Sequence, residues 1–312
     1  MRSLLFVPAD SPRKLEKSLQ SGADVLIFDL EDAVSPARKE DGRVEVVKFL
    51  TQVKASGVKT PKLYVRVNAL TTGMTLADLA AVMRCRPDGI ALPKSSGAAD
   101  VGLLAAYLEA FEQMFPAVAG ETAQTAILPI VTETAEALAG LNSYRGASPR
   151  LAGLMWGAED LAGDIGALTN KDEEAPEQWT SPFGLVRNLC LFAAAAAGVP
   201  AIDTVPTELN NPEALLRETR RAYRDGFSAK AAIHPAQVPV INQAMTPDAQ
   251  AQEWARRVIE AFASNTSVGV ATLDGKMLDT PHLRLARKIA AATQLAEEGF
   301  DDDRSFGRCA CR

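Results

Sequence analysis

The sequence contains few of the residues on which several protein classes depend. Only 4 cysteines and 2 histidines occur among 312 residues, which excludes a disulfide framework and disfavours zinc sites built from these side chains. No apolar run approaches the roughly 20 residues that a membrane span needs. Pro8 and Asp10 interrupt the apolar start of the chain, so we expect no signal peptide. The sequence therefore predicts a protein of the reducing cytoplasm that does not enter a membrane.

An excess of basic charge is also missing. The formal net charge is -6, with acidic and basic residues mixed along the chain. This balance argues against nucleic acid as a partner, although it permits a local basic pocket for an anionic ligand. The densest basic stretch, 217–224, is interrupted by Glu218 and has a helical period, which is typical of a solvated helix face.

A dinucleotide-binding fingerprint is absent too, since no G-x-G-x-x-G follows the first apolar run. The chain instead repeats an alternation of near-continuous apolar runs with segments of helical period. The candidate strands are 3–9, 24–32, 62–70, 89–95, 126–134, 151–160, 201–209 and 227–235. Such strands predict a parallel sheet that is buried on both faces. Their number predicts an α/β fold of the (β/α)₈ TIM-barrel type.

The C-terminal part of the chain has no barrel position left to fill. Asp274-Gly275 lies between short apolar runs and predicts a hairpin, and Thr280-Pro281 predicts a helix start. We expect a catalytic barrel over 1–262, a hairpin-helix lid over 263–298 and a disordered tail over 299–312. The tail contains a lone C-x-C, Cys309 and Cys311, with no partner ligands for a metal.

Polar residues gather at the C-terminal ends of the candidate strands. They are Asp29, Glu31, Asp32, Arg66, Asn68, Lys94, Glu133, Glu159, Asp160, Asp203, Lys230 and His234. In TIM barrels this rim carries the active site. For any single residue the plainer interpretation is a charge that turns to solvent, but polar residues on every rim strand together indicate a site.

The rim has the side chains of a hard-cation site. Glu133 and one of Glu159 or Asp160 would be neighbours across the barrel mouth, because successive strand residues face opposite ways. Carboxylate oxygens without cysteine or histidine suit Mg²⁺ or Mn²⁺. Arg66 could fork onto a substrate carboxylate or carbonyl oxygen, and the structural alternative is a Glu133–Arg66 salt bridge. A metal and an arginine at one oxygen can stabilise an enolate or alkoxide.

Motifs along nearly the whole chain, from residue 2 to about 290, resemble the citrate lyase β-subunit-like family of the HpcH/HpaI aldolase superfamily. They are RSLLFVPAD, DLEDAV, YVRVNAL, LPKS, TETAEAL, WGAEDLAGDIG, AIDTV and GFSAKAAIHPAQV. That family includes malyl-CoA and citramalyl-CoA lyases. The resemblance implies a TIM barrel, Mg²⁺ (or Mn²⁺), and cleavage or formation of a carbon–carbon bond beside a coenzyme A thioester.

The resemblance also assigns roles at the metal centre. Glu133 of TETAEAL and Asp160 of GAEDL would bind the metal, and Glu159 would point elsewhere. Arg66 of YVRVN would bind the substrate oxygens. Glu31 and Asp32 of DLEDAV would hold metal-bound water.

Coenzyme A contacts are implied at the first and last strands. Phe6 lies near the end of the first strand, and Arg13 and Lys17 on the following helix are candidates for phosphate contacts. Ile233 and His234 belong to the closing motif of the eighth strand. Ordinary exposed helix charges and a buried structural histidine are the alternatives.

The lid of this family carries an acid/base aspartate in an M-[IL]-D-x-P motif, which here is Asp279. It closes over a neighbouring subunit's site, so the resemblance implies a homo-oligomer, either a trimer or a hexamer made of two trimers. The alternative role for Asp279 is helix capping. Because citrate lyase β-subunits generally lack this lid, its presence favours free acyl-CoA thioesters.

The predicted function is a Mg²⁺-dependent lyase that cleaves or forms a short 3-hydroxy-dicarboxylyl-CoA. Citrate lyase β-subunit and malyl-CoA thioesterase are alternatives, and a catalytically silent barrel acting as a binding subunit is a distant one. A pyruvate-class hydroxy-acid aldolase would need an early histidine, but both histidines, His234 and His282, come late. Thr132 departs from the apolar residue usual before Glu133. The loop 169–184 is individual to this chain, so the choice of acyl-CoA stays open.

Overall fold

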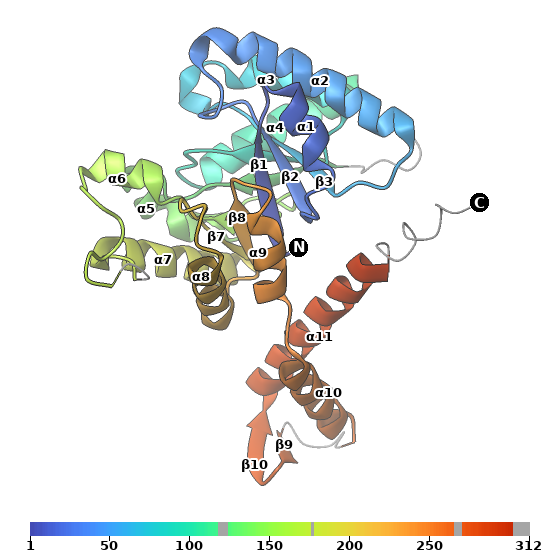
Figure 1. The fold of residues 1–312 in the computed structure, drawn as a ribbon, viewed down its shortest axis with the longest axis vertical. Coiled ribbons are helices and arrows are strands. Elements are labelled where there is room, and N and C mark those ends of the chain that lie inside the picture. The colour runs from blue at the N-terminus through green and yellow to red at the C-terminus, as the bar shows by residue number, and fades with distance from the viewer. Residues whose placement is uncertain (118–123, 176–177, 265–269, 302–312) are drawn as a thin grey trace. The chain divides into compact units, whose positions relative to one another are not determined.

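The computed structural model describes residues 1–117, 124–175, 178–264 and 270–301 (Figure 1). Each predicted strand segment contains one strand of a parallel sheet. The strands are β1 (Ser3–Pro8), β2 (Val25–Asp29), β3 (Lys62–Arg66), β4 (Gly89–Leu92), β5 (Ala126–Pro129), β6 (Leu154–Met155), β7 (Ala201–Asp203) and β8 (Ala229–Ala232). All are shorter than predicted. Asp29, Arg66 and Asp203 are the last residues of their strands, whereas Asn68, Lys94, Glu133 and His234 lie beyond the strand ends.

The strands close into the predicted TIM barrel, which is therefore confirmed. Their order is β5-β4-β3-β2-β1-β8-β7-β6, with parallel pairing between neighbours. Parallel bridges Ile127–Leu151 and Ile130–Met155 join the two ends of the sheet. The Val131 N–H also donates to the Met155 carbonyl at 2.9 Å. Closure brings the ends of β5 and β6 side by side at the rim.

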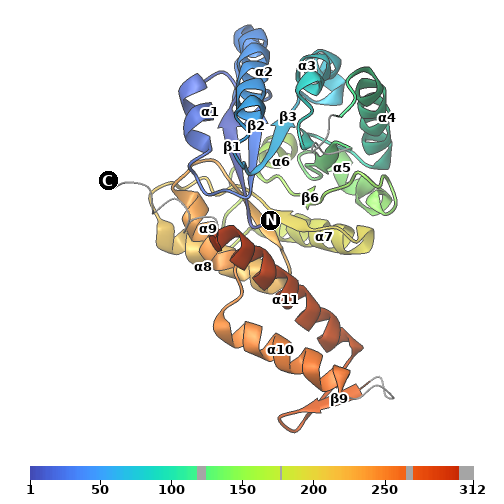
Figure 2. The same cartoon turned by 90° about the vertical axis from the view of Figure 1, so that its right-hand side faces the viewer.

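Helices surround the strands in the alternation that the sequence predicts (Figure 2). They are α1 (Pro12–Ser18), α2 (Lys39–Ser56), α3 (Thr75–Val82), α4 (Ala98–Met114), α5 (Ala135–Gly140), α6 (Glu159–Ile165), α7 (Ser181–Ala197), α8 (Pro212–Asp225) and α9 (Gln237–Met245). Short 3₁₀ turns are η1 (Pro36–Arg38), η2 (Leu70–Thr72), η3 (Met83–Cys85) and η4 (Leu141–Tyr144). Helix α8 shows the local rules: the Asn211 side chain accepts from the Ala214 N–H, and Pro212 opens the helix.

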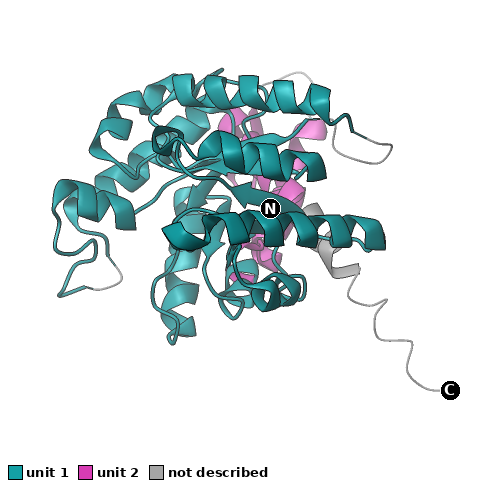
Figure 3. Cartoon of the chain, turned by 90° about the horizontal axis from the view of Figure 1, so that it is seen from above, with its two compact units in different colours: residues 1–242 teal, residues 243–312 magenta. Residues whose placement is uncertain are grey.

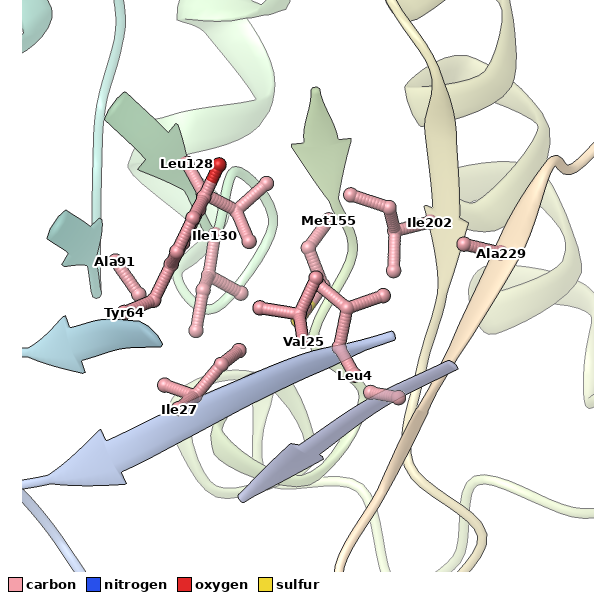
Figure 4. Close-up of a cluster of buried hydrophobic side chains, with 11 residues drawn as sticks. Leu4, Val25, Ile27, Tyr64, Ala91, Leu128, Ile130, Met155, Ile202 and Ala229 are labelled. Carbon is pink, nitrogen blue, oxygen red and sulfur yellow. The ribbon is translucent and has the colours of Figure 1, made fainter. Parts of the chain in front are cut away.

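The inside of the barrel is filled by apolar side chains from all eight strands or their ends (Figure 4). They are Leu4, Val25, Ile27, Tyr64, Ala91, Leu128, Ile130, Met155, Ile202, Ala229 and Ala231. Tyr64 lies so close to Gly89 that a Cβ there would sit 2.5 Å from its ring. Because the barrel is packed rather than hollow, polar chemistry is confined to its ends.

The chain divides into two compact units, residues 1–242 and the described residues of 243–312 (Figure 3). The described elements of the second unit are α10 (Ala249–Ala263), β9 (Val270–Leu273), β10 (Lys276–Asp279) and α11 (Thr280–Asp301). Leu278 and Ala286 pack with Ala255 and Val258 of α10. Helix α10 thus lies in this unit, whereas the sequence prediction placed it in the barrel domain.

The predicted hairpin and helix are present in the second unit. Strands β9 and β10 pair antiparallel around a turn at Asp274 and Gly275, both with positive φ, as a two-residue hairpin turn requires. Helix α11 continues to Asp301, past the predicted lid end at 298. The rest of the predicted tail, with Cys309 and Cys311, lies outside the described residues. No helix in the described ranges is long and apolar enough to cross a membrane.

Candidate functional site

A cavity of about 380 Å³ opens at the C-terminal ends of the barrel strands. Its lining includes several residues that the sequence analysis assigned to the site. These are Phe6, Asp32, Arg66, Glu133, Asp160 and Ile233. Residues up to 227 positions apart in the sequence, Phe6 and Ile233, meet here because the barrel closes. These residues, which the sequence places at the ends of different strands, therefore line one cavity at the rim.

Arg66 ends β3, opposite Asp29 at the end of β2. Its Nε and Nη2 donate to the two Asp29 carboxylate oxygens at 2.7 and 2.6 Å. Its Nη1 lies 2.8 Å from Glu31 Oε2. The fork that we assigned to substrate is thus taken by Asp29, and the predicted alternative of a Glu133–Arg66 salt bridge is replaced by these pairs. Asp29 uses one N–H group of Nε and one of Nη2, so the second N–H group of Nη2 and those of Nη1, which faces Glu31, do not bind Asp29.

Asp29 received no role from the sequence, although its position at a strand end was noted. It is buried and also accepts from the backbone N–H groups of Glu31 and Ala33, at 2.9 and 3.1 Å. It therefore fixes both the guanidinium of Arg66 and the backbone that carries Glu31. The sequence signal for it was its place at the end of a predicted strand, as the first residue of DLEDAV, because the register that pairs it with Arg66 is visible only in the structure.

We expect Arg66→Lys to lower kcat/KM by more than about tenfold, since an ammonium cannot form two parallel bonds to a carboxylate. Steady-state kinetics would measure the loss. Arg256→Lys is the control, because Arg256 pairs, among the described residues, with exposed Glu253 and Glu260 on α10. Near-normal kinetics for Arg66→Lys would reduce Arg66 to a general electrostatic role.

Glu133 follows β5 and is 3% exposed. Its Oε2 accepts from the backbone N–H of Lys94 at 2.5 Å. Burial raises the pKa of the Glu133 carboxyl to about 8; the Glu31 and Asp160 carboxylates add to this rise, while the Lys94 N–H and Arg66 oppose it. The charged form of the Glu133 carboxyl is therefore destabilised, and a proton or a metal cation would stabilise it.

Thr132 and Gly157 link the ends of β5 and β6. Gly157 N–H donates to Thr132 Oγ1 at 3.0 Å, and Thr132 Oγ1 donates to the Gly157 carbonyl at 3.1 Å. A hydroxyl at 132, in place of the apolar residue usual in the family, thus has a structural use. Gly157 also leaves room for Glu133: a Cβ at 157 would lie 2.7 Å from Glu133 Cγ.

We expect Gly157→Ala to displace the Glu133 carboxylate and to lower activity and Mg²⁺ affinity by roughly 10- to 100-fold, the effect of a misplacement near 1 Å. Gly163→Ala on α6 is the matched control, because nothing lies within 4 Å of its added Cβ. Isothermal titration with Mg²⁺ and a thermal melt would separate loss of the site from loss of the fold. Equal Mg²⁺ affinities in the two variants would contradict the role of Gly157.

The sequence predicted that Glu159 and Asp160 end a strand over 151–160, and this is wrong. Strand β6 is only Leu154–Met155, and both carboxylates lie in the first turn of α6. The positive end of the helix dipole favours acidic side chains there. Glu159 Oε1 accepts from Asn170 Nδ2 at 2.8 Å, while Asp160 Oδ1 lies 3.6 Å from Lys94 Nζ. The two side chains thus have different partners, although helical rather than strand geometry separates them.

Lys94 is a site residue whose role sequence reasoning missed. Its ammonium lies 2.5 Å from Glu31 Oε1, 3.4 Å from Asp32 Oδ2 and 3.6 Å from Asp160 Oδ1. The Lys94 ammonium therefore contacts both Glu31 and Asp32, which were predicted to hold metal-bound water, and lies near Asp160, a predicted metal ligand. Its place in the LPKS motif at a strand end was the available signal.

The donor set fits magnesium. Glu133 and Asp160 line one cavity, their oxygens are hard donors, and the buried Glu31 Oε2 has the Arg66 guanidinium as an ion-pair partner without a well-formed hydrogen bond. In the described part of the chain, no group of three or more His, Cys, Asp or Glu side chains could hold a metal alone. Two carboxylates with water and substrate oxygens is the usual arrangement for Mg²⁺, whereas zinc would need more protein ligands.

Of the residues predicted to contact coenzyme A, two line the cavity and three do not. Phe6 and Ile233 line the cavity, and the Arg66 guanidinium carbon lies 5.0 Å from the Phe6 ring centre. Arg13 and Lys17 are exposed on α1, outside the cavity lining. His234 is exposed, and its Nδ1 accepts from the Ala236 N–H at 3.2 Å, so the alternative of a buried histidine is wrong.

Asp279 is the last residue of β10 and directly precedes α11 in the second unit. Its side chain is 56% exposed, and Oδ1 lies 2.6 Å from His282 Nδ1. The Asp279 N–H also donates to His282 Nδ1 at 3.2 Å. The carboxylate is thus accessible to solvent and held by a side chain from the first turn of α11.

Comparison with known proteins gives consistent matches over most of the chain. Residues 2–235 match the family described as HpcH/HpaI aldolase/citrate lyase, and residues 189–296 match carbon–carbon bond lyases of the TIM-barrel fold. The chain is 33% identical over 290 residues to citrate lyase subunit beta of Haemophilus influenzae, covering 92% of this chain and 95% of the relative. It is 34% identical over 299 residues to (3S)-malyl-CoA thioesterase of Cereibacter sphaeroides, covering 94% of each.

A solved structure is similar over nearly its whole length. CitE from Mycobacterium tuberculosis, in complex with magnesium, acetoacetate and coenzyme A, is 30% identical with a TM-score of 0.74. The match covers 94% of this chain and 98% of that chain.

Proposed function

We propose that this chain, which belongs to the HpcH/HpaI aldolase/citrate lyase family, is a magnesium-dependent carbon–carbon lyase. Its substrate would be a short 3-hydroxy-dicarboxylyl-CoA thioester such as malyl-CoA or citramalyl-CoA. Cleavage would yield an acyl-CoA and glyoxylate or pyruvate, and the reverse reaction would join them. The observation that carries this proposal is the presence of Glu133, Asp160 and Arg66 in the lining of one rim cavity.

The reaction breaks the bond between the thioester α-carbon and the carbon that bears the hydroxyl. The hydroxyl passes its proton to water and its oxygen becomes a carbonyl oxygen, while the electron pair of the broken carbon–carbon bond moves onto the thioester as an enolate. Magnesium, bound by Glu133 and Asp160, would supply Lewis-acid polarisation of the substrate oxygen. Arg66 would donate the N–H groups that do not bind Asp29 to the same substrate oxygen, and would stabilise the negative charge that this oxygen carries after it loses its proton. Asp29 holds the guanidinium in place for this task.

The enolate must gain a proton at its α-carbon to leave as acyl-CoA. Arg66 cannot supply a usable proton, because its guanidinium stays charged. We assign this step to Asp279, delivered by the segment 263–298 of a neighbouring subunit as a lid. The protein would then be a homo-oligomer, a trimer or a hexamer, because a lid that acts on a neighbour requires one.

Coenzyme A would lie along the Phe6 and Ile233 side of the cavity, where both side chains form part of the lining. Arg13 and Lys17 are our candidates for its phosphates, as exposed cations on the helix that follows β1. His234 would contribute through its backbone. The M. tuberculosis relative, whose structure contains coenzyme A and magnesium, supports this choice of ligands.

A citrate lyase β-subunit and a malyl-CoA thioesterase are the alternative functions. The two relatives with these names match this chain about equally, at 33% and 34% identity. The citrate lyase relative also aligns with 92% of this chain, so the length of the match does not favour either. Because a match of this length must extend into the C-terminal hairpin and helix, these elements do not separate the two functions, and the assay with free acyl-CoA substrates decides between them. We also propose a reducing cytoplasm as the location, where Cys85 and Cys190 remain buried free thiols.

Assays of the purified chain would test the proposed function. With Mg²⁺, glyoxylate or pyruvate is mixed with acetyl-CoA or propionyl-CoA, and the products are identified by mass spectrometry. A 3-hydroxy-dicarboxylyl-CoA that disappears from the product mixture when EDTA is added is the expected result. Free coenzyme A and a free hydroxy-dicarboxylate would indicate hydrolysis after condensation. Absence of any condensation or cleavage across this panel would favour an acyl-carrier substrate or a silent barrel.

A further inference from the structure

Lys94 adopts an unusual backbone conformation at the edge of the proposed metal site. It follows β4, and its φ of 52° places it in the left-handed region, with only Arg86 and Asp274 as other non-glycine examples among the described residues. A lysine pays a conformational cost there, so other contacts must stabilise it. The next residue, Ser95, supplies them: its N–H donates to the Ile130 carbonyl, and Tyr144 Oη donates to its carbonyl.

This conformation lets one residue act on the site twice. The Lys94 N–H donates to Glu133 Oε2. The Lys94 ammonium contacts Glu31 Oε1 at 2.5 Å and lies 3.4 Å from Asp32 Oδ2. It is also 3.6 Å from Asp160 Oδ1, so it stands between the predicted metal ligand and the pair Glu31 and Asp32.

The ammonium matters because the site has too many carboxylates for an open metal centre. Besides Glu133 and Asp160, Glu31 and Asp32 could each turn an oxygen towards a cation. If they did, few coordination positions would remain for substrate oxygens. In the described part of the chain, Arg66 and Lys94 are the cations within 4 Å of the Glu31 carboxylate, whereas Lys39 donates to the Glu31 backbone carbonyl.

We propose that Lys94 is a positioning residue of the cation site, which keeps Glu31 and Asp32 off the ion so that Glu133 and Asp160 remain its only protein ligands. This inference rests on the proposed function, since it concerns the same metal. The cost of the arrangement is electrostatic: a fixed ammonium near Asp160 repels a divalent cation. Lys94 thus weakens metal binding but keeps coordination positions open.

Metal binding without substrate tests this role. Lys94→Met removes the ammonium but keeps the length of the side chain. We expect it to bind Mg²⁺ on the order of tenfold more tightly in isothermal titration, as removal of one nearby positive charge implies. With Mn²⁺ as the probe, water-proton relaxation should show fewer exchangeable waters on the ion than in the unaltered protein. The kcat of the proposed lyase reaction should fall despite the tighter metal binding.

Three further variants make the test specific. Lys94→Arg keeps the charge and should keep the original Mg²⁺ affinity. Lys94→Gly adopts positive φ without steric cost and keeps the N–H to Glu133, so it should reproduce the tighter binding even if Lys94→Met does not fold. Lys48→Met, at an exposed position on α2, is the control for loss of one positive charge far from the site.

The outcomes separate the two proposals. If the unaltered protein binds neither Mg²⁺ nor Mn²⁺, the metal site of the proposed function fails, and this inference fails with it. If the unaltered protein binds metal but Lys94→Met and Lys94→Gly bind it no more tightly, only the role of Lys94 is overturned. Tighter binding with an unchanged number of metal-bound waters would also overturn it.

Discussion

Glu133→Gln and Asp160→Asn should each remove measurable Mg²⁺ binding and lower kcat/KM by roughly 10³-fold or more. Lewis-acid stabilisation by a metal supplies several kcal/mol to the transition state, and each 1.4 kcal/mol corresponds to about tenfold in rate. Glu133 lines the cavity from the segment after β5, and Asp160 lines the same cavity from the first turn of α6. If these two carboxylates are the protein ligands of the ion, as we propose, loss of either one leaves too few anionic donors.

The fold should survive these substitutions. Burial raises the pKa of Glu133 to about 8, so a neutral glutamine suits its environment better than an unpaired carboxylate does. A thermal melt in the absence of metal should therefore show equal or greater stability for Glu133→Gln. Titration calorimetry with Mg²⁺ and steady-state kinetics after chelation and repletion measure the loss of function.

Glu159→Gln is the matched control for the metal ligands. Glu159 is adjacent to Asp160 and lines the same cavity, but its Oε1 accepts from Asn170 instead of facing Lys94. We expect it to keep Mg²⁺ binding. If Glu159→Gln lost the metal and Asp160→Asn kept it, the two roles would have to be exchanged.

Asp279→Asn should lower kcat by about 10²–10⁴-fold, the usual contribution of a general acid or base. Asparagine keeps the size of the side chain and can still cap α11, but it cannot carry a proton. Since Mg²⁺ and Arg66 bind the substrate elsewhere, KM should change much less than kcat. Steady-state kinetics in the cleavage direction would measure both. A fully active Asp279→Asn would rule out the assignment.

Mixed oligomers test whether Asp279 acts on a neighbouring subunit. Asp279→Asn chains and Arg66→Ala chains are each expected to be nearly inactive alone. In a mixed trimer, an intact Arg66 and an intact Asp279 from different chains can form one complete site, so partial activity should return. Light scattering must first show that the protein is an oligomer. A monomer, or no recovery in verified mixed oligomers, would contradict a lid that acts on a neighbour.

The sequence predicted which residues lie at the rim, but it did not predict which of them pair with one another. The positions of Glu133 and Arg66 at strand ends were readable, because apolar runs end there and parallel strands end on the same side of a barrel. The partner of Arg66 could not be predicted from the sequence. Asp29 takes its fork because β2 and β3 pair in a register that sets the two residues opposite each other, and register depends on contacts between strands.

The end of β6 shows a second limit. Glu159 and Asp160 were assigned to opposite faces of a strand, but they begin α6. An apolar run followed by two acidic residues is compatible with both structures. Only the closure of β6 against β5, through Thr132 and Gly157, sets where the strand stops and the helix begins.

The sequence by itself determined the fold class, and it predicted the rim as the location of the candidate site and carboxylates as its ligands. These follow from apolar periodicity and from the residue types at the strand ends, which are local properties of the chain. Only the tertiary structure decided which charges meet. Lys94 lies far in sequence from Glu31 and Asp160, yet contacts both, because closing a barrel brings the ends of distant strands to one rim and a left-handed φ turns this side chain toward them.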